Sequence, residues 1–159
     1  MQTQSQHSED MQRLARLVDD IGVAMLTTEE PDGSLRSRPL VTLQMDGDGA
    51  LWFFTSISSL KIAALDQHGR VNLSYAKADT RHFASVSGVT QVIRDPAKAR
   101  ELWSPVLLAW FPDGVDDPDL VLLKVVIEAA EYWDDPAGPV RRVLGLAGEA
   151  EHRKVIPAH

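Results

Sequence analysis

The sequence contains no cysteine, so disulfide bonds and thiolate metal sites are excluded. Positive charge is scarce: 16 Lys and Arg stand against 23 Asp and Glu, and the formal net charge of −7 argues against general nucleic-acid binding. No apolar run approaches the length of a membrane-spanning helix, and the first ten residues lack the basic and apolar stretches of a signal peptide. We therefore expect a cytoplasmic protein that binds neither membrane nor nucleic acid.

The remaining composition is that of one globular domain. The chain has 159 residues, of which 44% are apolar and 25% are charged, and this is enough to build a single core. We predict a disordered polar tail over residues 1–8, a folded domain over residues 9–135 and a C-terminal extension over residues 136–159. Whether that extension is a weak helix or a tail that docks on a partner stays open at this point.

Hydrophobic periodicity predicts strands with helices set between them. Apolar residues at helical spacing from Met11 to Ile21 predict a first helix that Ser8 would cap. Shorter helices are expected within residues 58–65 and 95–103. Strand patterns occupy residues 23–28, 35–45, 50–55, 71–76, 83–92 and 120–133. Strand hairpins with inserted helices predict an α+β fold built on a closed or half-closed antiparallel barrel.

Residues 51–65, LWFFTSISSLKIAAL, are the most informative segment for function. An apolar strand runs into several hydroxyl residues, and a helix then begins with Lys61 in its first turn. A cation at that place opposes the helix dipole by roughly 0.3–1 kcal/mol, whereas a bound anion would reverse the sign. Hydroxyls, free N–H groups and an ammonium suit a phosphate. The alternative, in which Ser58 or Ser59 merely caps the helix and Lys61 is solvated, is equally open.

Two arginines form a second candidate site. Arg36 and Arg38 lie two positions apart in one predicted strand, so both project from the same face. Arginine pairs of this kind are usually solvated. However, Pro39 beside them removes a hydrogen bond from the strand ladder, which predicts an edge or a bulge where a ligand can enter.

Aromatic residues mark a third place. Trp110 and Phe111 interrupt the long irregular segment 104–119, and aromatics there favour an interface or a flat ligand. A loop that is pinned to its own core explains them equally well. The five histidines show no ligand spacing, so no metal site is expected, and no G-x-S-x-G elbow predicts a nucleophilic serine.

Four stretches together resemble the pyridoxamine 5′-phosphate oxidase-like split barrels, which bind flavin, and within them the general stress protein branch. They are residues 25–40, 51–65, 83–103 and 110–125. The resemblance covers roughly residues 9–135. It implies a six-stranded antiparallel split β-barrel with flanking helices, the FMN-binding split barrel. It also implies a homodimer with one flavin at each end of the dimer interface, FMN being the expected cofactor and FAD possible.

The resemblance also implies the cofactor-binding residues. In the oxidases of the family, an arginine on the second strand holds the flavin phosphate, and Arg38 takes the similar place. A Thr, a Ser and an Arg-Lys pair complete that cradle, but Leu60 replaces the Arg here, and Arg36 or Ser56 would compensate. The loop that reaches the flavin from the partner subunit carries Trp110. The full expected set is Arg36, Arg38, Pro39, Leu40, Phe54, Thr55, Ser56, Ser59, Leu60, Lys61 and Trp110.

The expected function follows from the cofactor. A flavin-dependent oxidoreductase of unknown substrate is the first hypothesis, because the flavin itself carries the redox chemistry. A non-catalytic flavin-binding stress sensor or flavin reserve is the second, and an interaction module with an empty cradle is the third. The segment 138–159 lacks the arginine and tryptophan pattern with which the oxidases grip pyridoxal phosphate, so the resemblance argues against vitamin B6 oxidation.

Overall fold

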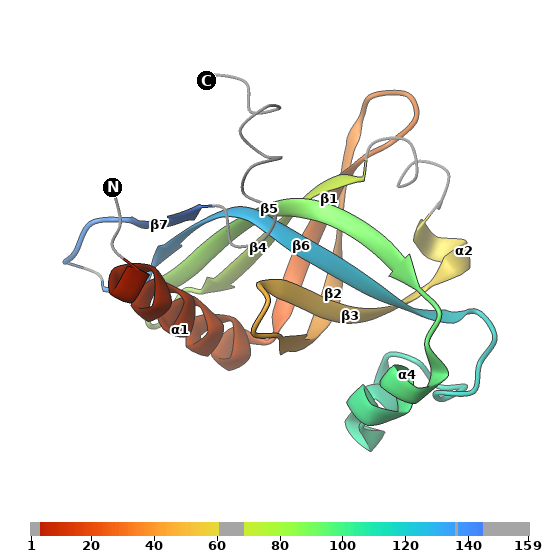
Figure 1. Cartoon of the computed structure of the whole chain (residues 1–159). Helices are drawn as coiled ribbons and strands as arrows, with labels where there is room; N and C mark the ends of the chain where they lie inside the picture. Colours follow the sequence, from red (N-terminus) through yellow and green to blue (C-terminus); the bar gives the residue numbers. More distant parts are fainter. Residues whose placement is uncertain (1–3, 61–68, 136, 145–159) are drawn as a thin grey trace.

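The computed structural model describes residues 4–60, 69–135 and 137–144 (Figure 1). The elements, in chain order, are α1 (Gln4–Ile21), β1 (Val23–Glu29), β2 (Leu35–Met45), β3 (Ala50–Ser56), α2 (Ile57–Leu60), β4 (Arg70–Lys77), β5 (His82–Ile93), α4 (Pro96–Leu102), the 3-10 helix η1 (Pro105–Ala109), β6 (Leu120–Trp133) and β7 (Arg141–Leu144). None of the helices in these residues is both long and apolar enough to cross a membrane.

The sheet closes into a barrel because β3 pairs with both β2 and β6. The order of hydrogen-bonded strands is β3-β2-β1-β4-β5-β6-β7, and every pairing is antiparallel. The long strand β6 pairs with β3 over its first half, from Leu120 to Val126, and with β7 from Ala129 to Tyr132. The predicted six-stranded antiparallel barrel is therefore confirmed, with β7 added outside the closure.

Two apolar cores account for the apolar runs in the central strands. Leu51 and Phe53 point into the barrel and are fully buried. Trp52 and Phe54, on the opposite face of β3, belong to a second cluster that Leu102 of α4 and Leu107 of η1 cover. Because β3 is buried on both faces, it shows a continuous apolar run rather than an alternating pattern.

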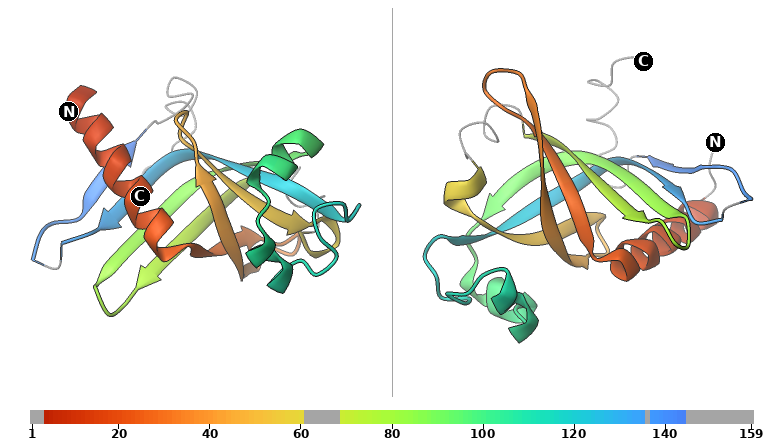
Figure 2. Two further views of the ribbon diagram at one scale, coloured as in Figure 1. Left: turned by 90° about the horizontal axis from the view of Figure 1, so that it is seen from below. Right: turned by 180° about the vertical axis from the view of Figure 1, so that it is seen from behind.

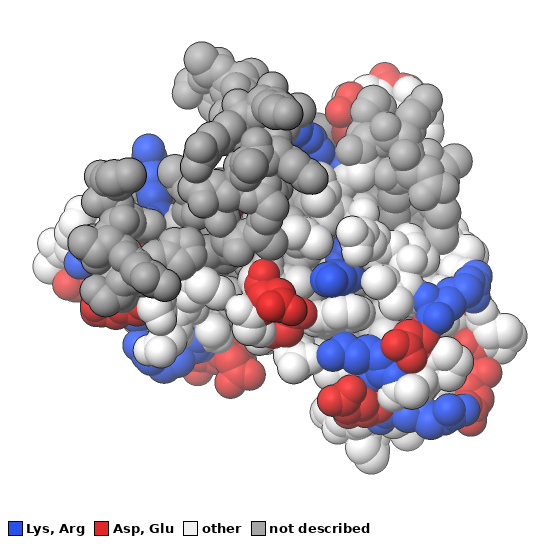
Figure 3. Space-filling model, viewed as in Figure 1, with Lys and Arg blue, Asp and Glu red and all other residues white. Residues whose placement is uncertain are grey.

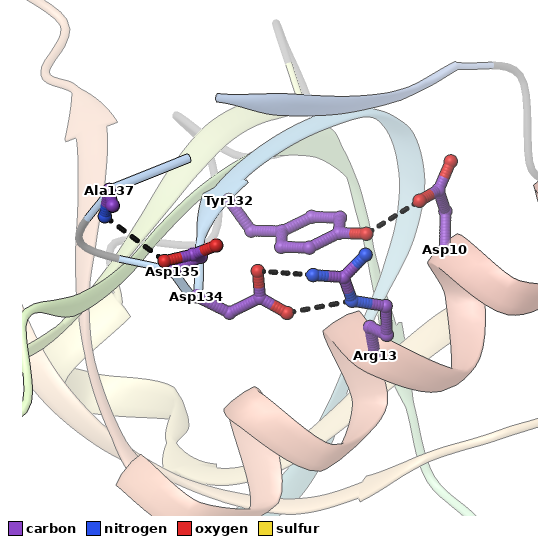
Figure 4. A network of polar contacts seen from close by, with 6 residues as sticks. All are labelled: Asp10, Arg13, Tyr132, Asp134, Asp135 and Ala137. Atoms are coloured by element: carbon purple, nitrogen blue, oxygen red, sulfur yellow. Dashed lines mark hydrogen bonds and ion pairs between the residues drawn. The ribbon is translucent and has the colours of Figure 1, made fainter. Parts of the chain in front are cut away.

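A polar cluster fastens α1 to the end of β6 (Figure 4). The Arg13 guanidinium donates two hydrogen bonds to the Asp134 carboxylate, at 2.8 and 2.6 Å. The Tyr132 hydroxyl donates to Oδ1 of Asp10 at 2.6 Å, and Asp10 is only 3% exposed. We call these four residues the α1 cluster. Figures 1 and 2 show that α1 lies at the end of the barrel opposite to α2 and the β1–β2 hairpin.

The chain departs from the sequence-based expectations at both ends. Helix α1 begins at Gln4, so residues 4–8 are helical rather than a disordered tail, and Ser8 lies inside the helix instead of capping it. No glycine or proline precedes Ser8 to stop the helix, and glutamine is a good helix former. Residues 141–144 form strand β7 rather than a helix or a docking tail. The second half of β6 is an open edge beyond β3, and β7 satisfies its backbone N–H and C=O groups.

Candidate cofactor-binding site

Arg38 points into the barrel near the β1–β2 hairpin. In β2 it shares a face with Leu40, which is buried in the barrel core, and it pairs across the sheet with the fully buried Leu26. Its Nη2 donates a hydrogen bond to the Thr28 hydroxyl at 3.0 Å. The Nε and Nη1 atoms are buried and have no hydrogen-bond partner among the described residues.

Burial lowers the pKa of Arg38 below its ordinary value, and the neighbouring Arg36 lowers it further, whereas Glu30 raises it. A guanidinium nevertheless stays protonated in proteins, so this half-buried side chain is a cation, and its Nε and Nη1 atoms are buried. A buried donor without a partner costs about 1–3 kcal/mol, and more when it is charged. Two such N–H groups on one cation are a strong structural indication of an anion that belongs between them.

Arg36 does not join Arg38 in this place. Its side chain is 55% exposed and lies 4.0 Å from the Glu30 carboxylate, at the limit of an ion pair. Arg36 therefore meets the expectation of a solvated arginine, whereas Arg38 does not. It forms no described contact with Arg38 through which it would compensate for Leu60.

Thr55 lies on the inward face of β3 and is 2% exposed. Of the residue pairs between β2 and β3, Thr42 with Phe53 is the one nearest to Arg38 and Thr55, and both residues follow that pair toward the same end of the barrel. Arg38 and Thr55 thus lie toward one end of the barrel, on the inward faces of β2 and β3. The side chains of Leu40 and Phe54 pack into the two cores, and the two residues pair with Ala24 of β1 and Leu122 of β6; Pro39 lies exposed on the outward face.

Ser56 belongs to a group of hydrogen-bonded side chains with Ser58 and Asp119. Its hydroxyl donates to Oδ2 of Asp119 and also lies 2.9 Å from the Ser58 hydroxyl. The Ser58 hydroxyl and amide donate to the same carboxylate at 3.0 and 3.2 Å. Hydrogen bonds from Ser56 and then Ser58 lower the pKa of Asp119 below its ordinary value of 3.8. Ser56 therefore fastens the start of α2 to the start of β6.

The sequence analysis did not single out Asp119, because it ends an acidic stretch, residues 113–119, whose composition is typical of solvent-exposed turns. The remaining predicted phosphate ligands cannot be placed. Ser59 and Leu60 belong to α2 without described side chains, and Lys61 lies outside the described residues.

The aromatic loop is pinned to the core, but not by Trp110. Leu107 is 3% exposed, and the Phe111 ring lies 6.2 Å from that of Phe54 in an edge-on arrangement. Trp110 follows η1 and remains 44% exposed. Each of the two interpretations of this loop therefore applies to one residue. Phe111 packs against the core of its own chain, and Trp110 is exposed and available to another molecule.

A cavity of about 320 Å³ lies elsewhere, between α4 and residues 115–118. Phe54, Ile93 and Leu122 are among its lining residues, and Arg38 is not. Oppositely charged residues, Arg100 and Asp116, lie 3.5 Å apart among those that line it. Figure 3 shows acidic and basic side chains interspersed on this face rather than gathered by sign. Because Arg38 does not line this cavity, the cavity is separate from the Arg38 site.

Comparison with known proteins identifies the family. The chain matches the sequence profile of the pyridoxamine 5′-phosphate oxidase-like proteins over residues 9–154, and it belongs to that family. Protein bli-3 of Neurospora crassa is 30% identical over 132 residues, covering 77% of this chain and 63% of that protein. The chain thus spans less than two thirds of this relative's length.

Solved structures agree with this assignment. The general stress FMN/FAD binding protein of Xanthomonas citri is 31% identical, with a TM-score of 0.68 over 84% of this chain and 94% of that one. A Clostridium acetobutylicum protein related to general stress protein 26 of Bacillus subtilis has a TM-score of 0.72 and 19% identity, covering 87% of this chain and 98% of that one. The latter shows the shared fold. The resemblance drawn from the sequence is confirmed.

Proposed function

We propose that this protein binds FMN, with the flavin phosphate at Arg38. The observation that carries the proposal is the buried Arg38 guanidinium, whose Nε and Nη1 have no partner among the described residues. A phosphate offers charged acceptor oxygens that satisfy both groups. The buried Thr55 hydroxyl lies at the same end of the barrel, and Ser59 and Lys61 are the further ligands that we expect. The Xanthomonas citri relative, described as an FMN/FAD binding protein, supports this choice.

A bound flavin supplies the electron-transfer chemistry, so we propose a flavin-dependent oxidoreductase whose substrate is unknown. The role of the protein would be to bind the phosphate, orient the flavin ring and exclude water. A non-catalytic sensor or flavin reserve of the general stress type is the alternative, and the general stress names of two similar proteins are compatible with either function. Rapid reoxidation of the reduced protein, or its reduction by a substrate, separates the two functions.

We also propose that the protein is a homodimer and that Trp110 contacts the partner's flavin. The large apolar side chains Val106, Leu108 and Trp110 are 75%, 47% and 44% exposed within one short segment. Exposed apolar residues gathered in this way mark interaction sites. The apolar part of β6 does not support a dimer, because residues such as Leu122 and Val125 are already buried within one chain.

The direct experiment is a visible spectrum of the purified protein, with mass identification of any molecule released on denaturation. Stripped protein is then titrated with FMN while the quenching of flavin fluorescence is followed. Saturation at micromolar protein supports the proposal, and no saturation at high micromolar protein contradicts it. Light scattering should give twice the 17.5 kDa of one chain, and a single-chain mass would exclude the dimer.

A further inference from the structure

Thr28 is a buried polar residue that accepts a hydrogen bond from the Arg38 side chain. It lies in β1, it is 4% exposed, and its hydroxyl accepts the hydrogen bond from Nη2 of Arg38 at 3.0 Å. The same hydroxyl lies 3.4 Å from Oε2 of Glu30, to which it donates. The three side chains therefore form a short relay in which a neutral hydroxyl stands between the cation and the carboxylate.

This order of groups has an electrostatic consequence. A carboxylate in direct contact with Arg38 would neutralise the guanidinium, and an incoming phosphate would have to displace it. The hydroxyl instead holds one nitrogen in place and leaves the positive charge available. An arginine side chain loses conformational freedom when it is fixed, and a preset orientation removes part of that loss from ligand binding.

We propose that Thr28 is a positioning residue that sets the Arg38 guanidinium for the phosphate group, and that it thereby determines the preference for FMN over riboflavin. The inference rests on the proposed flavin function. Riboflavin carries the same ring without the phosphate, so an effect transmitted through Arg38 changes the affinity for FMN alone.

The test compares the dissociation constants of both flavins for stripped protein by fluorescence quenching. Thr28→Val keeps the shape of the side chain and removes the hydroxyl, so the Kd for FMN should rise about tenfold, while that for riboflavin stays within about twofold. Thr28→Ser, which retains the hydroxyl, should bind FMN like the unchanged protein. Thr28→Ala provides the same deletion if the valine variant does not fold.

Thr27→Val is the matched control. Thr27 immediately precedes Thr28 in β1 and points to the opposite face, where its hydroxyl lies 2.7 Å from that of Ser37. Removing this hydroxyl should change neither dissociation constant. A loss of FMN affinity of the same size in Thr27→Val would show that any hydroxyl of β1 matters, and it would overturn the inference.

A double-mutant cycle with Arg38→Met isolates the transmitted effect. Thr28→Val should have no further effect on FMN binding once Arg38 is replaced, and a loss that persists in that background would overturn the inference. An equal loss for both flavins, or no loss for either, would also overturn it. If the unchanged protein does not bind FMN at all, the proposed function fails first, and this result is distinct from the others.

Discussion

The two ends of the barrel each hold an arginine, and the two arginines differ in their hydrogen bonding. In the α1 cluster, Arg13 donates two hydrogen bonds to Asp134, and Tyr132 donates one to Asp10. At the other end, Arg38 makes one hydrogen bond and keeps two buried N–H groups without a described partner. The hydrogen bonds that Arg13 donates to Asp134 raise the pKa of Arg13, whereas burial lowers that of Arg38. Arg13 holds α1 in place, whereas Arg38, with two groups that lack a partner among the described residues, is the cation for which we propose an anionic ligand.

The largest expected effect comes from breaking the α1 cluster at Tyr132. Tyr132→Phe removes the donor to Asp10, which is 3% exposed, and weakens the solvation of a buried acidic group. The free energy of unfolding should fall by about 3 kcal/mol. Urea denaturation followed by circular dichroism measures the change.

Tyr75→Phe is the control for this prediction. The Tyr75 hydroxyl lies 2.7 Å from that of Thr42, so its loss removes a bond between two neutral groups. The expected decrease is only about 1 kcal/mol. Equal losses in the two variants would mean that the Asp10 partner adds nothing.

The next prediction exchanges the two arginines for methionine, which fills similar space without the charge. Arg38→Met removes the unpartnered buried groups, so the ligand-free protein should unfold no more easily than before. Its FMN affinity should fall by about 1.5–3 kcal/mol, the range for hydrogen bonds to a charged group. Titration and urea denaturation of the same preparation measure both quantities.

Arg13→Met should show the reverse result. Loss of the two hydrogen bonds to Asp134 should lower the free energy of unfolding by about 1.5–3 kcal/mol, while FMN affinity stays unchanged. If Arg38→Met destabilises the ligand-free protein as much as Arg13→Met does, the buried guanidinium is a structural group and the contrast between the two ends is wrong.

The features that the sequence predicted are those encoded by neighbouring residues. Alternation located β2 at residues 35–45, and a long apolar pattern located β6 at residues 120–133, as the structure has them. Because Arg36 and Arg38 are two positions apart in one strand, the sequence also predicted that they share a face. It could not show which of the two is buried, because that depends on Leu26 and Thr28 from the neighbouring strand.

The features that the sequence analysis missed depend on contacts between residues that are far apart in the sequence. Ser58 and Asp119 are 61 positions apart, and Arg13 and Asp134 are 121 apart. Nothing in the local pattern distinguishes such acids from turn residues that face solvent. Strand β7 likewise exists because β6 extends beyond β3, a property of the closed barrel rather than of residues 141–144 themselves.

The smallest expected effect concerns Asp119, whose hydrogen bonds from Ser56 and Ser58 order the start of α2 near the Arg38 end. These bonds favour the carboxylate and lower its pKa in the folded state below 3.8. The folded state therefore binds the proton less readily than the unfolded state. The stabilisation is complete above about pH 5 and disappears as the pH falls through the lowered folded value.

Asp119→Asn removes this charge, so its unfolding midpoint in urea should lie slightly below that of the unchanged protein from pH 7 to pH 5. The difference should narrow as the pH falls below 3.8, where the unchanged protein loses the charge as well. Asp116→Asn is the control, because that side chain is 83% exposed and its ion pair with Arg100 should contribute almost nothing. A midpoint difference for Asp119→Asn that remains constant down to pH 3 would show that the carboxylate charge is not what fastens α2, and that the hydroxyls of Ser56 and Ser58 are held by shape alone.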